Sequence, residues 1–183
     1  RRTRAHYFLQ MPPPWALQGG MKRVATGLAI VAWALAAPAQ ARDSLGVFGG
    51  WGAFRDPAVP RCYAIAEPSR TSAGKAGWRA FASVGTWPAR HVRGQLHIRL
   101  SRERGPQARV YLSIGERRFA LSSGKADAWA QDARMDAAII AAMRSSPTIS
   151  VESSTASGRP FSDVYELKGA ATAMDAAALG CAV

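Results

Sequence analysis

The stretch RGQLHIRLSRERGPQARVYLSIG, residues 93–115, decides the fold class of this chain. Apolar and polar side chains alternate in both of its halves, and Gly105 followed by Pro106 separates them. Alternation with a period of two is typical of a β-strand that buries one face, and a Gly-Pro pair marks a turn. The stretch therefore predicts an antiparallel hairpin. The residues expected to face the core are Leu96, Ile98, Leu100, Val110, Leu112 and Ile114.

Similar alternation recurs in five other stretches of the chain. They are RCYAIAEP (61–68), GWRAFASV (77–84), RRFALSS (117–123), TISVES (148–153) and SDVYELK (162–168). Two more stretches look helical, because apolar residues recur every four positions in DARMDAAIIAAMRSSP (132–147) and GAATAMDAAALGC (169–181) is rich in alanine. Together these patterns predict a mainly β protein with about seven antiparallel strands and two short helices.

A secretory signal is expected in MKRVATGLAIVAWALAAPAQA, residues 21–41. Two basic residues follow its methionine, an apolar run comes next, and an A-x-A cleavage site ends it. The apolar run is too short for a transmembrane anchor. We therefore expect cleavage between Ala41 and Arg42, a single domain over 42–183, and a location in the periplasm or at the cell surface. Residues 1–20 lack any apolar period and are expected to be a disordered upstream extension.

Cys62 and Cys181 are the only two cysteines of the chain. In an exported protein such a pair is expected to form a disulfide, which here would tie an early strand to the C-terminal helix. The spacing matches neither a zinc site nor a CxxC redox motif. We therefore expect no metal and no cofactor.

The chain is strongly basic, with 24 Lys and Arg against 12 Asp and Glu. Several cations lie on the polar face of the 93–115 stretch, which suits phosphate or sulfate groups. The sequence thus suggests an anionic lipid or glycan as partner, and no nucleic acid is expected. The alternative is that these charges prevent edge-to-edge pairing of exposed strands. The predicted anion-binding patch consists of Arg93, His97, Arg99, Arg109 and Tyr111.

No catalytic constellation is recognisable in the sequence. Beyond residue 42 only His91 and His97 could act as a general base, and no G-x-S-x-G elbow, P-loop or HExxH motif is present. We expect Asp132 to cap a helix, Asp136 to lie on a solvated helix face, and Asp163 to accept backbone N–H groups of a turn near Gly158. Core packing or a ligand shelf could explain the tryptophans. These are Trp51, Trp78, Trp87 and Trp129.

The C-terminal half carries a family resemblance. It contains AWA at 128–130, the pattern I..AM at 139–143, and the segment DVYELKGA at 163–170 before the final cysteine. These residues resemble the invasion-associated locus B family of small exported proteins from alphaproteobacteria, and Cys62 followed by a strand fits the first cysteine of that family. The resemblance is clearest over 128–181 and loose over 68–105. It implies an immunoglobulin-like β-sandwich and a periplasmic or surface location. The family takes its name from an association with host-cell invasion. It transfers no catalytic residues.

The expected function is that of an exported, non-enzymatic module that binds an envelope or host-surface component. One rival is a small secreted hydrolase, and another is a structural or stress-related periplasmic protein. A deep pocket in which Asp163, a serine and either His91 or His97 converge within hydrogen-bond reach would favour the hydrolase, whereas a shallow surface would favour binding.

The first prediction concerns processing. If 21–41 is a cleaved signal, the exported protein should begin at Arg42, because the A-x-A site ends at Ala41. Intact-mass measurement and N-terminal sequencing of the envelope fraction check this. A mature protein that still carries Met21 would contradict it.

Overall fold

The computed structural model describes residues 42–72 and 78–182 of the chain. The predicted signal and the upstream extension lie outside these residues. The elements follow the order β1 (Asp43–Phe48), β2 (Trp51–Asp56), β3 (Arg61–Ala66), β4 (Arg70–Thr71), β5 (Phe81–Trp87), the 3-10 turn η1 (Pro88–Arg90), β6 (Val92–Arg99), β7 (Val110–Ile114), β8 (Arg117–Ser123), β9 (Asp127–Trp129), α2 (Ala133–Met143), β10 (Thr148–Ser154), β11 (Pro160–Glu166) and α3 (Ala170–Gly180).

All described strands belong to one open antiparallel sheet of 11 strands, in the order β1-β2-β3-β5-β6-β9-β8-β7-β10-β11-β4. The mainly β class with two helices is confirmed, but the expected sandwich of about seven strands is wrong. The sequence missed β1 and β2, whose glycines obscure the alternation. It also missed β4 and β9, which are too short to show any alternation.

The predicted hairpin at 93–115 is also wrong, although its core-facing residues are right. All six of them are almost completely buried. Their strands are not neighbours, because β6 pairs with β5 and β9, whereas β7 pairs with β8 and β10. Alternation determines which face of a strand is buried, but it does not determine which strand lies beside it.

Arg104 holds the connection between β6 and β7 in place of a hairpin turn. Its guanidinium donates hydrogen bonds to the backbone carbonyls of Gly105 and Ala108 within the connection. It also donates to those of Gly124 and Ser123 at the end of β8. The connection therefore packs against the β8–β9 turn, so that β6 and β7 enter different parts of the sheet.

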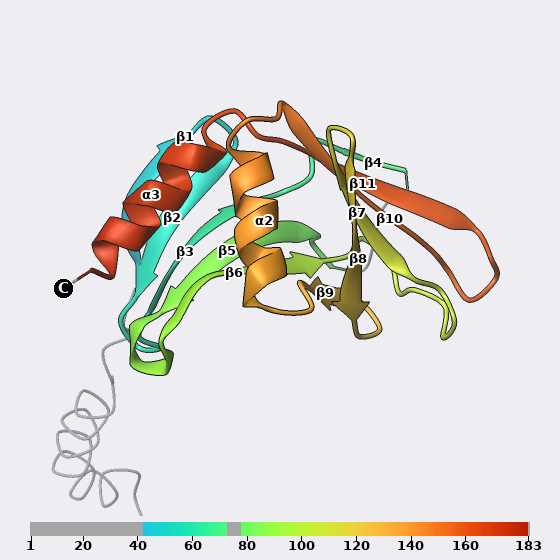
Figure 1. Cartoon of the computed structure of the whole chain (residues 1–183), viewed down its shortest axis with the longest axis horizontal. Coiled ribbons are helices and arrows are strands. Elements are labelled where there is room, and N and C mark those ends of the chain that lie inside the picture. The colour runs from blue at the N-terminus through green and yellow to red at the C-terminus, as the bar shows by residue number, and fades with distance from the viewer. Residues whose placement is uncertain (1–41, 73–77, 183) are drawn as a thin grey trace, which may run out of the picture. The chain divides into compact units, whose positions relative to one another are not determined.

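Strand β8 links these two parts. Its first residues, Arg117 to Leu121, pair with β7, and its last two, Ser122 and Ser123, pair with β9. Both helices lie against the same face of the sheet (Figure 1). Buried side chains from both parts of the sheet and from both helices form one hydrophobic core.

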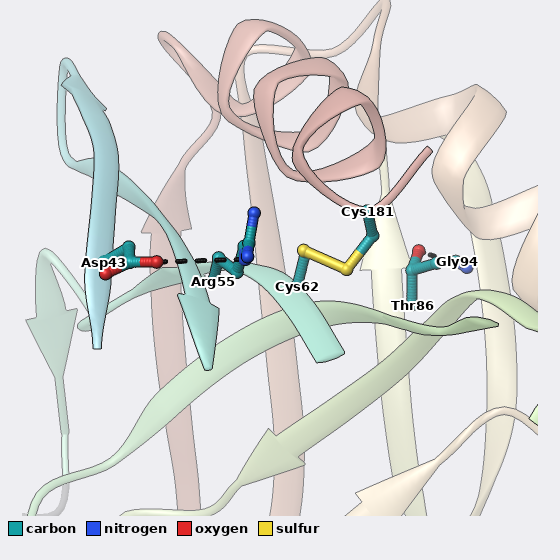
Figure 2. The surroundings of a disulfide bond; sticks show 6 residues. All are labelled: Asp43, Arg55, Cys62, Thr86, Gly94 and Cys181. Carbon is teal, nitrogen blue, oxygen red and sulfur yellow. Dashed lines mark hydrogen bonds and ion pairs between the residues drawn. A yellow bond between two sulfur atoms is a disulfide. The ribbon is translucent and has the colours of Figure 1, made fainter. Parts of the chain in front are cut away.

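A disulfide joins Cys62 of β3 to Cys181, the residue that ends α3, as the sequence predicted (Figure 2). The two Cα atoms are 5.8 Å apart although the residues are 119 positions apart in the chain. Cys62 is completely buried, and Ala64 and Ala66 of the same strand face the core with it. The bond therefore holds the last helix against the early strands of the sheet.

Removal of this bond should destabilise the protein. Cys181→Ser is expected to lower the free energy of unfolding by about 2–5 kcal/mol, because the reduced unfolded chain gains the freedom of a long open loop. Denaturant unfolding with and without reductant checks this. The double variant Cys62→Ser/Cys181→Ser should be insensitive to reductant, whereas the wild type should shift. A wild-type midpoint that reductant leaves unchanged would contradict the prediction.

Candidate binding groove

A groove of about 610 Å³ lies between α2, α3 and the ends of β5 and β6. This volume is within the range of small-molecule sites, roughly 300–1,000 Å³. Alanines and larger apolar residues form most of its wall. The lining residues are Val84, Thr86, Pro88, His91, Arg93, Gly94, Ala133, Ala137, Ile140, Ala141, Arg144, Met174, Ala177, Ala178, Cys181 and Ala182.

Helical periodicity explains why α2 has two apolar faces. Ile139 and Met143 point into the protein core and are almost fully buried. Ala133, Ala137 and Ala141 recur every four residues, so they share another face of the helix, which lines the groove. Their side chains are too short to close the space between α2 and α3. The groove thus exists because the residues of α2 that line it are small, while other residues of the same helix hold it against the core.

A β-bulge at Gly94 forms the floor of the groove. The pairing of β5 with β6 shifts between Gly85 and Trp87, and Gly94 has a φ of 69°. A side chain there would be strained, and its Cβ would lie 2.7 Å from Cδ1 of Ile140. Gly94 also donates a backbone hydrogen bond to Oγ1 of Thr86, beside the disulfide (Figure 2). The positive φ therefore favours glycine at this position, and the missing side chain leaves room for Ile140 of α2.

The bulge also changes where Arg93 lies. Strict alternation predicts Arg93 on the same face as His97 and Arg99, but the extra residue of a bulge reverses the alternation beyond it. Arg93 lines the groove instead. The predicted five-residue patch is therefore not one surface.

The mouth of the groove is cationic. His91, Arg93 and Arg144 line it, and none of the described lining residues is acidic. Arg144 makes a bidentate ion pair with Asp175 of α3, with distances of 2.6 and 3.2 Å between the paired atoms. This hydrogen bonding holds the pKa of Asp175 below its usual value. The side chain of Arg93 has no hydrogen bond or ion pair within the described residues.

His97 and Arg99 lie on the opposite face of the sheet, where both contact Asp127 of β9. Nε2 of His97 lies 2.9 Å from one carboxylate oxygen, and Arg99 donates to the other. The imidazole stacks on Trp129, and the guanidinium of Arg99 lies over Trp78. Asp127 thus offsets much of the positive charge that we expected on this face from the sequence.

Arg109 and Tyr111 occupy a third place, on or beside β7. Strands β9 and β8 separate them from His97 and Arg99. The guanidinium of Arg118 covers the Tyr111 ring at 4.0 Å and pairs with Glu152. Arg109 is exposed. Because Arg93 also lies elsewhere, the five patch residues fall into three separate places: His97 with Arg99, Arg109 with Tyr111, and Arg93 at the groove.

The residues considered for catalysis do not converge in the described part of the chain. Asp163 is fully buried and accepts a hydrogen bond from the backbone N–H of Ser101 at 2.9 Å, not from the Gly158 turn. His97 contacts Asp127, and His91 lies at the groove. No group of three or more potential metal ligands occurs among the described residues.

The tryptophans divide between the core and the surface. Trp51 is completely buried, and its indole N–H donates to the carbonyl of Glu166 at 2.8 Å. Trp78, Trp87 and Trp129 are partly exposed. Trp78 stacks under Arg99 and Trp129 stacks on His97, beside Asp127. Sequence reasoning missed this cluster because Asp127 is 30 residues from His97 along the chain.

Asp136 fixes the α2 wall of the groove. Asp132 caps this helix as predicted, by accepting from the backbone N–H of Met135. Asp136, expected on a solvated face, is buried and accepts a 2.8 Å hydrogen bond from the backbone N–H of Leu96. Burial raises the pKa of this carboxyl above its usual value. The bond ties α2 to β6 beside the bulge.

The fold and the groove define a mainly β, disulfide-bonded protein with a preformed apolar groove. Comparison with protein-family models, with curated proteins and with solved structures gave no match. Among residues 42–72 and 78–182, no helix has the length and apolar character needed to span a membrane.

Two substitutions at Asp136 should separate its hydrogen bond from its charge. Asp136→Ala leaves the Leu96 N–H without its acceptor and should lower the free energy of unfolding by about 1–3 kcal/mol. Asp136→Asn keeps an acceptor oxygen and should be at least as stable as the wild type at neutral pH.

The raised pKa of Asp136 determines how the stability difference between the Asn variant and the wild type changes with pH. Ionisation of Asp136 opposes folding above the folded-state pKa, and this cost disappears as the pH falls below the unfolded-state value. Denaturant unfolding at neutral and acidic pH should therefore show that the advantage of Asn over Asp shrinks with acidity. An Asn variant as unstable as the Ala variant would overturn this account.

Proposed function

We propose that this chain is an exported, non-enzymatic binding module of the envelope or cell surface, of the invasion-associated locus B type, and that the groove between α2 and α3 is its binding site. The resemblance over 128–181 supports the family, and the Cys62–Cys181 disulfide is of a kind that persists in oxidising compartments. The partner is an envelope or host-surface component, with anionic lipid or glycan as the expected class.

The groove is the observation that carries this proposal. Its walls are formed before any ligand binds, because the disulfide fixes the end of α3 and Asp136 fixes α2. Concave, mostly apolar sites with a few polar groups at the mouth are typical of small-molecule binding. A structural protein requires no such cavity. A hydrolase would require an oriented base in it, and none of the described residues that line the groove is an acid that could orient His91.

The hydrolase remains as a second candidate because Asp127 could orient the imidazole of His97, as an acid orients a catalytic base. Within the described residues no hydroxyl or thiol completes this pair. Hydrolysis of a chromogenic ester that is lost in His97→Ala, with the fold intact, would replace the binding proposal by this one.

Binding of a neutral polarity-sensitive dye, such as Nile red, tests the groove. The wild type should enhance its fluorescence, since the dye moves from water to an apolar site. Ala137→Trp and Ala178→Trp, one on each wall, should abolish the enhancement by filling the space. Thr172→Trp is the matched control, because Thr172 is exposed on α3 and does not line the groove. Equal binding in all four proteins would reject the groove as the site.

A further inference from the structure

We propose that the groove binds a single-chain amphiphile with a negatively charged head group, with the chain between α2 and α3 and the carboxylate or phosphate at Arg93. This inference rests on the proposed function, since it names the ligand class of the same site.

The shape of the groove suits one acyl chain. On α2 its lining extends from Ala133 to Arg144, about three turns or about 16 Å at 1.5 Å per residue. The α3 wall extends from Met174 to Ala182. Both walls present methyl and methylene groups, without an acidic side chain among the described lining residues. Burial of a flexible hydrocarbon chain here is favourable in proportion to the apolar area removed from water.

The charges at the mouth select the head group. Arg93 is exposed and has no ion pair within the described residues, so its guanidinium can pair with an incoming anion without first breaking a contact. Arg144 keeps its bidentate pair with Asp175 and so holds the two walls together. A guanidinium matches carboxylate and phosphate geometry in a bidentate way.

His91 adds a second polar group at the mouth. It is the only non-glycine residue with a positive φ among the described residues, at 56°. This left-handed conformation makes His91 the C-cap of η1, where its backbone N–H donates to the carbonyl of Pro88. The residue is exposed and lines the groove two positions before Arg93. A neutral head group would leave this concentration of donors unused.

Displacement of the neutral dye by amphiphiles with the same chain tests the ligand class. The competitors are dodecanoate, dodecanol and dodecyltrimethylammonium, each below the concentration at which it forms micelles, with a lysophosphatidate of the same chain to separate phosphate from carboxylate. Dodecanoate or the lysophosphatidate should displace the dye at concentrations about tenfold lower than the neutral and cationic competitors.

Arg93→Gln should remove this preference while dye binding persists. Arg109→Gln is the matched control, because Arg109 is also an exposed arginine but lies beside β7 and does not line the groove. It should keep the preference. Added salt should weaken the anionic competitors more than dodecanol, because screening affects only the charged contact.

The outcomes separate the ligand class from the site. Suppose that the dye binds and Ala137→Trp abolishes that binding. If dodecanol then competes as well as both dodecanoate and the lysophosphatidate, or if Arg93→Gln changes nothing, the ligand class is wrong and the groove stands. If Ala137→Trp and Ala178→Trp leave dye binding intact, both proposals fail. A preference lost equally in Arg109→Gln would also overturn the role of Arg93, because it would reflect net charge alone.

Discussion

The position of α3 depends on the bond between Cys62 and Cys181. This helix is rich in alanine and begins at Gly169 without a side-chain cap, and three of its four buried residues are alanines, which offer little apolar area to hold it on the sheet. The disulfide pins its last residue to β3, and at its start the backbone of Gly169 lies so close to the carbonyl of Phe48 that no side chain would fit. With both ends fixed, α3 covers the early strands and becomes a rigid wall.

The opposite wall depends on an unrelated contact. Asp136 accepts from the backbone of Leu96, and the bulge at Gly94 leaves room for Ile140 beside it. Each helix is thus anchored to the sheet, and the pair Arg144–Asp175 joins them across the mouth. Because the facing side chains are mostly alanines, the space between the helices is not filled by the protein itself. Stability and the groove therefore come from different faces of the same two helices.

The distribution of acidic residues decides where a basic protein can attract an anion. On the outer face of the sheet, Asp127 contacts His97 and pairs with Arg99, so the positive charge of Arg99 is offset locally. Arg93 is not paired within the described residues and lies beside an apolar surface. The net charge of the whole chain, +12, does not distinguish these two environments. This difference favours the groove over the outer face as a site for an amphiphilic anion.

The sequence by itself determined the mainly β class, the buried residues around Leu96 and Leu112, the cap at Asp132 and the pairing of the two cysteines. The class and the buried residues depend on local periodicity. The cap depends on residues three positions apart, and each of the two cysteines has one possible partner. Tertiary structure alone decided which strands are neighbours, the reversal of Arg93 by the bulge, the approach of Asp127 to His97, and the burial of Asp136. Each of these depends on backbone brought together from distant positions, and a two-residue alternation carries no information about which distant strand or helix that will be.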